Sequence, residues 1–418
     1  MFLLNLYRRC LPVFVLSTSL GFADASHTVE HHDPIEIDSS LSLPKLVDLT
    51  MEKTPDASWL NALEQEAKTI AERGQSWIAG APLAGLRFQE ATSGTLHYLD
   101  ATIDIPLWNL GQRDAQQSLG LQAQASAETQ ALATKLRVAG LIRAALWDME
   151  LQKIRYEQVQ TDVATFEELH KKIGKQVELG DLPRADLLLA KTELLQKRSL
   201  LIQAEAELMH ARKRYSSITQ TTKVPANYQE NLAALKEISE HHPILVAINN
   251  QIDRKQGELN ALKLVGSGQT NLAIGVNSDR PSDNDPRSNK TESFNIGVVV
   301  PFGGSAHTNP QVAAINVELN RLISEREQLF RDLEQAHHEA EHNLEVNQAE
   351  LTIANDLKQA AEEHLNMTQL SYSVGEINLL DLLKIQARTQ QAVLNAKERA
   401  VMLQRDQAFY NQAVGVLP

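Results

Sequence analysis

The chain has 418 residues, with 53 acidic and 40 basic side chains, a formal net charge of -13 and only 5% aromatic residues. This acidic balance argues against a nucleic acid as partner, because nucleic-acid backbones bind basic surfaces. The single cysteine is Cys10, so the chain beyond residue 25 has neither a disulfide nor a thiol nucleophile.

Residues 1–25 are predicted to be a secretory signal peptide. Arg8 and Arg9 precede an apolar run over 11–20, and residues 23–25 read Ala-Asp-Ala, a cleavage site of small residues. No later stretch offers about 18 uninterrupted apolar residues, so we expect no transmembrane helix after the signal. If this protein enters a membrane, it has to do so as strands.

Residues 26–42 have no periodic pattern and are predicted to be a flexible start. They include His27, His31 and His32, which fit a solvated polar tail better than a metal site. From residue 43 leucines recur at helical spacing, and this pattern breaks at Pro55 and then resumes.

Residues 77–107 change to a period of two, which predicts a β-hairpin. From His97 to Leu107 the odd positions are mostly apolar and the even ones polar, as in a strand with one apolar face. Leu86 and Phe88 alternate with polar neighbours in a preceding strand, and Thr92-Ser93-Gly94 provides the turn.

Residues 269–303 repeat this hairpin. The segment from Asp279 to Glu292 is polar and contains Pro281 and Pro286, so it is predicted to be an exposed loop. The alternating apolar positions of its two strands are Leu272, Ile274 and Val276, and then Phe294, Ile296, Val298, Val300 and Phe302.

Trp77 and Trp108 lie at the same end of the first hairpin. Aromatic residues are expected at this place where a membrane β-barrel meets the interface with water. The strand pattern is also compatible with a soluble two-layer core, and the strands alone leave both interpretations open.

Two very long helical patterns follow the hairpins, over residues 112–176 and 309–372. At 1.5 Å per residue, some 65 residues make a rod of about 95–100 Å, which no globular domain needs. Shorter helices over 183–218, 243–265 and 379–414 are predicted to run back along these rods, with their breaks near the middle.

Each long helix is predicted to end in a helix-turn-helix tip, near residues 177–188 and 372–383. Gly180 and Gly375 suit a left-handed helix end, and they lie 195 residues apart. The same offset relates Asp186 to Asp381, and Leu187 to Leu382.

The duplication extends beyond the tips. Pro106 and Pro301, at the corners between strand and helix, have the same offset of 195 residues. We therefore expect two internal repeats, over 43–230 and 231–418. Leu232, Leu235 and Ile238 predict that the second repeat also begins with a helix, before Pro243.

Two hairpins contribute four strands, which cannot close a barrel. Open sheet edges in a membrane would leave backbone groups without hydrogen bonds, at a cost of several kcal/mol each. Three copies would supply twelve strands, which is enough to close a barrel around a lumen.

The order of elements resembles the TolC-like outer-membrane efflux proteins over essentially the whole mature chain. The most specific parts are the tip LSYSVGEINLLDLL with its following helix to Gly415, the corners at Pro106 and Pro301, and the start LSLPKLVDLTMEKTP. This resemblance implies a mainly α fold with a small antiparallel β part, assembled as a homotrimer. It also implies a shared twelve-stranded barrel in the outer membrane and a helical tunnel across the periplasm.

The resemblance also assigns roles to residues of this chain. In that family acidic residues ring a constriction at the periplasmic entrance, and the matching positions are Asp381 and Asp186, while Lys384 stands where some members have a second acid. The alternative is that both aspartates only stabilise a helix N-terminus. Adaptor docking is expected at residues of the two tips: Gly180, Leu187, Leu188, Gly375, Leu382 and Leu383.

His338 to His342 read H-E-A-E-H, which fits the H-E-x-x-H pattern of zinc proteases. A third ligand at Glu362 would lie about 30 Å along an unbroken helix, whereas a zinc ligand must come within about 2 Å. No other catalytic arrangement is recognisable, so we expect no enzyme, no cofactor and no resident metal.

The resemblance implies a passive outer-membrane duct for small toxic solutes such as drugs or divalent metal ions. A periplasmic adaptor would open it at the tips, and an inner-membrane pump, of the RND type, would supply the energy. The same architecture also serves type I protein secretion, and a periplasmic coiled-coil scaffold without a pore is an alternative of another class.

Overall fold

A computed structural model of the chain describes residues 35–280 and 290–418, apart from 91 and 93–96. The predicted signal peptide, the histidines at 27, 31 and 32, Ser93 and Gly94 of the first turn, and Pro281 and Pro286 lie outside the described residues. None of the helices in the described part has the length and apolar character needed to span a membrane.

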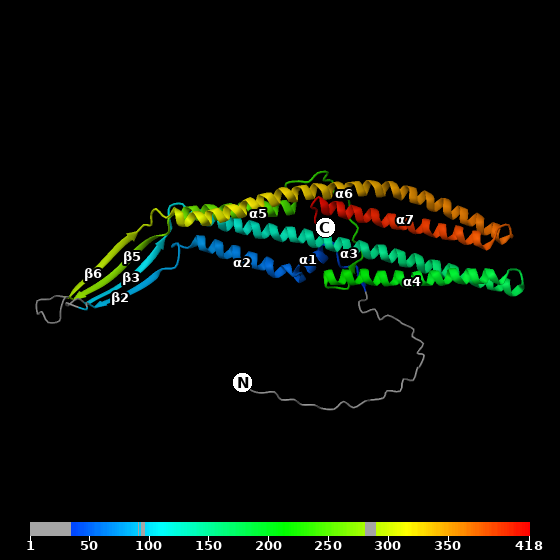
Figure 1. Ribbon diagram of the computed structural model, residues 1–418, viewed down its shortest axis with the longest axis horizontal. Coiled ribbons are helices and arrows are strands. Elements are labelled where there is room, and N and C mark those ends of the chain that lie inside the picture. The colour runs from blue at the N-terminus through cyan, green and yellow to red at the C-terminus, as the bar shows by residue number, and fades with distance from the viewer. Residues whose placement is uncertain (1–34, 91, 93–96, 281–289) are drawn as a thin grey trace, which may run out of the picture.

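The structure is built from long helices with a small sheet at one end (Figure 1). The elements are, in order, β1 (Glu36–Asp38), α1 (Leu43–Lys53), α2 (Asp56–Gln75), β2 (Leu83–Glu90), β3 (His97–Leu107), α3 (Gln112–Leu179), α4 (Arg184–Thr219), β4 (Lys223–Pro225), α5 (Pro243–Val265), β5 (Thr270–Arg280), β6 (Thr291–Val299), α6 (Ser305–Ser373) and α7 (Leu379–Ala413).

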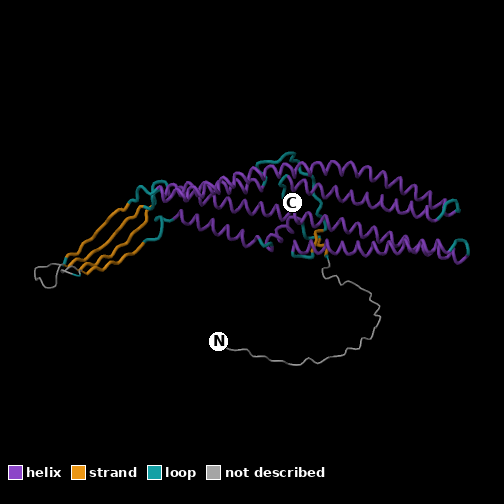
Figure 2. The backbone as a smooth tube through the Cα atoms, in the orientation of Figure 1, coloured by secondary structure: helices purple, strands orange, loops and turns teal. Residues whose placement is uncertain are grey.

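The two long rods are α3 and α6, with 68 and 69 residues. At 1.5 Å per residue each is about 100 Å long. Shorter helices run beside them, α2, α5 and α4 along α3, and α5 and α7 along α6, while the sheet and the helical tips lie at opposite ends (Figure 2). The predicted long rods with shorter companion helices are therefore confirmed.

The elements keep one lateral order along the whole length. The sheet has the order β2-β3-β5-β6. Beside it the helical contacts run α2-α3-α5-α6, and towards the tips they run α4-α3-α7-α6 (Figure 1). One edge of the chain is therefore β2, α2 and α4, and the other edge is β6 and α6.

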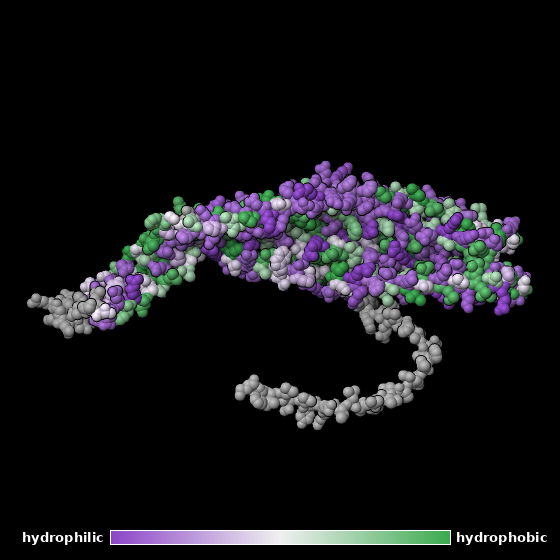
Figure 3. All heavy atoms as spheres, in the orientation of Figure 1, coloured by the Kyte–Doolittle hydropathy of each residue, from purple (hydrophilic) through white to green (hydrophobic). Residues whose placement is uncertain are grey.

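The sheet is antiparallel throughout, and its register separates apolar from polar residues. Residues directly opposite each other share a face, and one row across the sheet is Ala84, Ile103, Ile274 and Ile296. The next row on the other face is Gly85, Thr102, Gly275 and Asn295. The predicted alternation is thus correct, and hydrophobic side chains are visible on the sheet in Figure 3.

The middle of the rods contains the main apolar cluster, where α1 and α4 pack on α3. Leu46, Val47, Ile142 and Tyr215 are fully buried there, and each such apolar side chain contributes about 1.5–3 kcal/mol on burial. The hydroxyl of Tyr215 donates a hydrogen bond to the carbonyl of Lys223 at 2.6 Å, which holds β4 against the end of α4.

The prediction of a flexible segment over 26–42 is wrong for its last residues. Glu36–Asp38 form β1, which pairs in parallel with β4. Ile35, just before this strand, packs on the main cluster, so a contact distant in sequence orders a stretch that has no periodicity of its own.

The helix predicted from Leu232, Leu235 and Ile238 is also wrong, because residues 226–242 form an irregular connector. Side chains of α7 take the hydrogen bonds that a helix would have made internally. Asn411 Oδ1 accepts from the amide of Ala233 at 2.8 Å, and the hydroxyl of Tyr410 donates to the carbonyl of Leu235 at 2.7 Å.

Candidate functional site

The two helical tips end in the same backbone motif. Gly180 and Gly375 have φ of 84° and 81°, the left-handed conformation that favours glycine. At the first tip, Asp181 N donates to Gln176 O at 2.8 Å and Gly180 N to Val177 O at 3.1 Å.

The second tip repeats both bonds 195 residues later. Glu376 N donates to Ser371 O at 2.9 Å, and Gly375 N donates to Tyr372 O at 3.1 Å. This pattern is the Schellman motif, which satisfies carbonyls left free at a helix end. Both tips therefore reverse the chain sharply, and each presents the start of a returning helix.

The returning helices begin differently at the two tips. Asn378 Oδ1 accepts from the amide of Asp381 at 2.9 Å, which makes Asn378 the N-cap of α7. Pro183 occupies the equivalent position before α4 and makes no side-chain cap. In both cases an aspartate, Asp381 or Asp186, lies in the first turn.

Asp381 is exposed on the second tip. Lys384 Nζ lies 3.6 Å from its carboxylate, and the two side chains are 53% and 60% exposed. An exposed pair of this kind contributes less than about 1 kcal/mol. Asp381 thus remains a water-accessible negative charge, consistent both with a helix N-terminal role and with the predicted entrance.

Asp186, on the first tip, affects the pKa of Tyr372 on the second tip. Burial raises the pKa of the Tyr372 hydroxyl in the last turn of α6, and the negative charge of Asp186 raises it further. The hydroxyl oxygen of Tyr372 is buried without a hydrogen-bond partner among the described residues. Sequence reasoning missed Tyr372, although a tyrosine stands there where the first repeat has Val177.

The two tips are joined by an apolar cluster between α3 and α7. Leu382 and Leu383 are only 4% and 5% exposed, and they pack with Phe166 and Ile173 of α3. These two leucines were expected at an adaptor-docking surface, but within this chain they hold the hairpins together. Leu188 on the first tip is 65% exposed, and Leu187 packs at the border of the cluster.

The strand-to-helix corners lie at the far end of the rods. Pro106 is within β3, and its carbonyl accepts from the amide of Ala79 at 2.9 Å. Pro301 directly follows β6 and contacts Gly268, where a Cβ would be 3.2 Å from its ring. Both prolines therefore pack beside the segments that lead into a neighbouring strand, Pro106 beside Gly80 before β2 and Pro301 beside Gly268 before β5.

The two tryptophans at this end differ in exposure. Trp77 is 70% exposed. Trp108 is partly buried, and its indole nitrogen donates to the carbonyl of Ser76 at 3.0 Å. Phe302, which the predictions placed only in a strand, is 92% exposed just beyond β6, so Trp77 and Phe302 are the exposed aromatic residues of this corner.

The H-E-x-x-H motif lies on the unbroken helix α6 together with Glu362. The rings of His338 and His342 are stacked with centroids 6.4 Å apart. The described part of the chain contains no group of three or more His, Cys, Asp or Glu residues placed to hold a metal ion. The two histidines of the motif therefore lie close together because they are four residues apart on one helix.

No protein-family model matches the sequence, and no curated protein matches it significantly. Solved structures do match the fold. A membrane protein from Pseudomonas aeruginosa has a TM-score of 0.69 at 13% identity, covering 92% of this chain and 98% of that one.

Two further similar structures are channels. CusC, which forms a transmembrane channel, has a TM-score of 0.70 at 11% identity, covering 90% of this chain and 92% of its own. The outer-membrane channel OprN has a TM-score of 0.70 at 13% identity, covering 89% of each chain. The predicted resemblance is thus confirmed at the level of the fold: this chain has the TolC-like fold of these outer-membrane channels.

Proposed function

We propose that this chain is the outer-membrane channel component of an efflux system in a Gram-negative bacterium. It works as a homotrimeric passive duct for small toxic solutes, with a shared twelve-stranded barrel in the membrane. A periplasmic adaptor opens the duct at the helical tips, and an inner-membrane pump, of the RND type, drives transport. The fold shared with OprN and CusC supports this proposal.

The observation that carries the proposal is the pair of unpartnered edges on the chain. On α4, at one edge, Leu188, Leu195 and Ile202 recur every seven residues and are 65%, 54% and 69% exposed. A matching stripe at the other edge consists of Val346, Ile353 and Met367 on α6 and of Val374 directly after it.

Edges of this kind fit a ring of identical chains. The two stripes lie on different helices, so each copy would place its α6 against α4 of the next, a head-to-tail contact that closes when the rotation allows. The edge strands β2 and β6 would pair in the same step. One interface along the whole length would therefore bury the apolar stripes of the helices and pair the edge strands of the sheet.

The two faces of the sheet suit a barrel wall. On the apolar face Leu86, Phe294 and Ile296 are 77%, 68% and 65% exposed, as expected for residues that contact lipid. The other face carries polar residues such as Asp100 and Asn277, which would line a lumen filled with water. Such exposure is unfavourable for a soluble scaffold, because exposed apolar patches promote aggregation.

The proposal is tested by extracting the protein from outer membranes in mild detergent. We expect a trimer that conducts ions in planar lipid bilayers. Ile202→Lys on the edge stripe should reduce the trimer fraction, whereas the matched exposed substitution Gln196→Lys on the same helix should not. A monomer without conductance would refute the proposed function.

The cargo is tested separately by deleting the gene. Increased sensitivity to drugs or metal ions supports efflux of small solutes, whereas loss of a secreted protein assigns the same duct to polypeptide export.

A further inference from the structure

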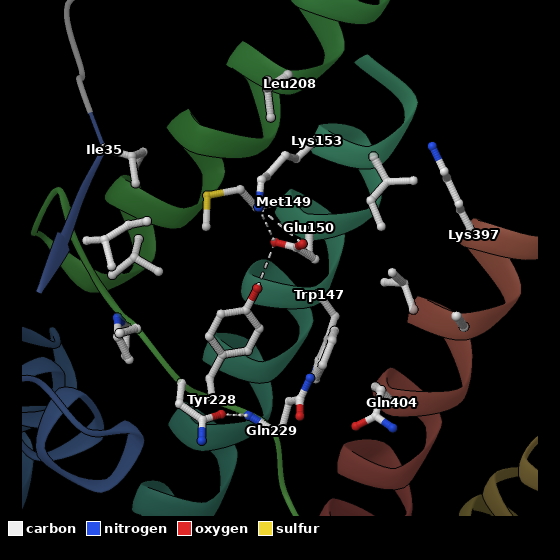
Figure 4. A pocket seen from close by; sticks show the side chains of 18 of the residues that line it. Ile35, Trp147, Met149, Glu150, Lys153, Leu208, Tyr228, Gln229, Lys397 and Gln404 are labelled. Atoms are coloured by element: carbon white, nitrogen blue, oxygen red, sulfur yellow. Dashed lines mark hydrogen bonds and ion pairs between the residues drawn. The ribbon is translucent and has the colours of Figure 1, made fainter. Parts of the chain in front are cut away.

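The apolar stripe on α4 lies on the side of the helix that faces away from its own chain. Leu194 and Leu208 face inward and are 7% and 5% exposed. Leu194 packs in the cluster between the tips, and Leu208 lines a cavity of about 750 Å³ between α3, α4, α7 and the connector after β4 (Figure 4). With 3.6 residues per turn, the exposed Leu195 and Ile202 lie on the other side of α4. The stripe is therefore accessible to another chain.

The two tips provide a common reference for the level of each residue along the rods. Both tips lie at the same end of the molecule (Figure 1), and Gly180 and Gly375 have the same place in them. Across the two hairpins, antiparallel helices contact each other at equal distances from these glycines. Lys397, 22 residues after Gly375, donates to the side-chain oxygen of Gln158, 22 residues before Gly180, at 2.8 Å. Levels on different hairpins can therefore be compared by counting residues from the glycines.

The apolar stripes of α4 and α6 match when they are counted in this way. The chain leaves its first tip along α4 and approaches its second tip along α6, so α6 of one copy would run antiparallel to α4 of the next. Each position of one stripe then has a counterpart at the same level of the other. The matched pairs are Leu188 with Met367, Leu195 with Ala360, and Ile202 with Ile353, at 8, 15 and 22 residues from the glycine of the respective tip.

The charges of the two helices are opposite. α4 carries seven basic and four acidic side chains, whereas residues 332–373 of α6 carry nine acidic side chains and one lysine. Among the described residues, the only ion pair of these nine acids joins Glu350 to Arg399. Two α6 helices would repel each other, so the charges favour contact between the unlike edges of two copies.

One pair of opposite charges lies beside the matched stripes. Lys191 follows Leu188 by three residues, and Glu363 follows Ala360 by three, so both lie on the same flank of their stripe. The same flanks meet when two helices pack antiparallel. Both side chains are exposed, and neither forms an ion pair with a described residue, although Glu363 accepts a hydrogen bond from the neutral side chain of Gln359 at 3.0 Å. Their charges are therefore free to pair between copies.

We propose that neighbouring copies join through α4 and α6 with residues at equal distances from Gly180 and Gly375 facing each other, and with Lys191 paired to Glu363. This inference rests on the proposed trimeric channel, and it adds the register of the subunit contact and the charges that select it. A shift by seven residues would keep the apolar stripes in contact but would move Lys191 about 10 Å along the helix from Glu363. The charges thus distinguish registers that the stripes alone do not.

Engineered cysteines test the register, because Cys10 is the only natural cysteine and is expected to leave with the signal. In the full-length protein in membranes, Leu195→Cys is combined either with Ala360→Cys, in register, or with Ile353→Cys, seven residues out of register. Mild oxidation should link neighbouring copies roughly tenfold faster in the first pair, because a disulfide needs Cα atoms within about 7 Å. Ile202→Cys with Ile353→Cys should link as fast as the first pair, with linked dimers and trimers measured on non-reducing gels.

The charge pair has its own readout. Lys191→Glu alone and Glu363→Lys alone should each slow linkage of the Leu195→Cys and Ala360→Cys pair severalfold, and the two reversals together should restore the rate. Faster linkage of the pair that contains Ile353→Cys, no linkage in any pair, or no recovery in the double reversal would overturn this register, even where a conducting trimer is recovered. A natural protein that is a monomer without conductance would instead refute the proposed function.

Discussion

The carboxylate of Asp186, in the first turn of α4, acts on the buried hydroxyl of Tyr372 in the last turn of α6 and helps to keep that hydroxyl protonated. The two residues belong to different helical hairpins. Ionisation of Tyr372 would place a second negative charge beside Asp186 without any hydrogen bond to stabilise it. Ionisation of Tyr372 is therefore expected to weaken the packing between the tips.

This relationship predicts alkaline weakening of the tip contact. The pKa of Tyr372 is raised above its ordinary value of 10.0, by burial first and by Asp186 second. A raised pKa contributes stability that is present below pH 10 and is lost as the pH rises towards the folded-state value. Hydrogen exchange of residues 365–388 should accelerate above pH 10 in the natural protein and much less in Tyr372→Phe. Equal acceleration in both proteins would contradict the assignment.

Replacing Gly180 at the first tip and Gly174 inside α3 by alanine should have opposite effects on stability. Gly180→Ala places a Cβ in a left-handed backbone at φ 84°, with no atom within 4 Å, so the cost is purely conformational, about 1–2 kcal/mol. Gly174→Ala, six residues earlier inside α3, meets only Leu187 at 3.8 Å and should stabilise the helix by about 0.5–1 kcal/mol. Protease cleavage at the first tip should rise in the former and fall in the latter.

The tips could be predicted because their structure is local. A glycine that ends a helix, and an asparagine three residues before an aspartate, determine the backbone within a few positions, and Gly375 and Asn378 adopt these roles. Periodicity likewise predicted the long helices and the two faces of the sheet. Burial of Leu382 and Leu383 was not predictable, since it depends on α3 lying beside α7.

The connector over residues 226–242 shows that local sequence can also predict a helix that does not form. Leu232, Leu235 and Ile238 have helical spacing, yet Asn411 and Tyr410 bind the connector backbone in an irregular form. Tertiary hydrogen bonds override a weak local preference. The effect of Asp186 on Tyr372 was missed for the same reason, because the residues are brought together only when two hairpins pack.

Substitution of Arg143 should cause a large loss of stability. It is 1% exposed, pairs with both carboxylate oxygens of Glu230 at 2.8 and 2.6 Å, and also donates to the carbonyl of Val416 at 3.1 Å. Arg143→Met leaves the largely buried Glu230 carboxylate without its cation, at about 3–5 kcal/mol.

The measurement is the thermal unfolding midpoint, with Arg214→Met as control. Arg214 pairs with Asp148, but its side chain is 52% exposed, so this loss should stay below about 1 kcal/mol. Adding Glu230→Gln to Arg143→Met should recover part of the lost stability. If the two single variants melted alike, the buried pair would not have the predicted role.

Protonation of His242 should lower the stability of the protein at acidic pH. Its ring is 2% exposed, and Nδ1 accepts from the amide of Ile244 at 3.3 Å, which caps α5. Burial lowers the pKa of His242 from its ordinary value of 6.5. The neutral ring therefore contributes stability that is complete above pH 6.5 and is lost as the pH falls through the lower folded-state pKa.

Unfolding midpoints at pH 8 and pH 5 measure this effect. The difference should shrink in His242→Gln, because glutamine offers an acceptor that does not titrate in this range. The exposed neighbour provides the control, and His241→Gln should keep the full difference. An unchanged pH dependence in His242→Gln would show that other groups cause it.

Adjacent positions of β5 give a prediction that separates a barrel from a scaffold. Val276 lies on the apolar face of the sheet and is 57% exposed, whereas Asn277 lies on the polar face, opposite Asp100 of β3. Val276→Lys would place a charge against lipid, at about 2–4 kcal/mol per chain near the middle of the membrane. Asn277→Lys adds the same side chain to the lumen, where water and Asp100 accommodate it.

The amount of trimer recovered from outer membranes should therefore fall sharply in Val276→Lys and remain near that of the natural protein in Asn277→Lys. In a periplasmic scaffold both faces of the sheet would meet water, so both lysines would be tolerated. In a compact core the apolar face would be covered, and Val276→Lys would reduce the total amount of folded protein rather than its assembly. Only a barrel wall predicts loss of assembly at one residue and tolerance at the next, because only there does the sheet separate lipid from water.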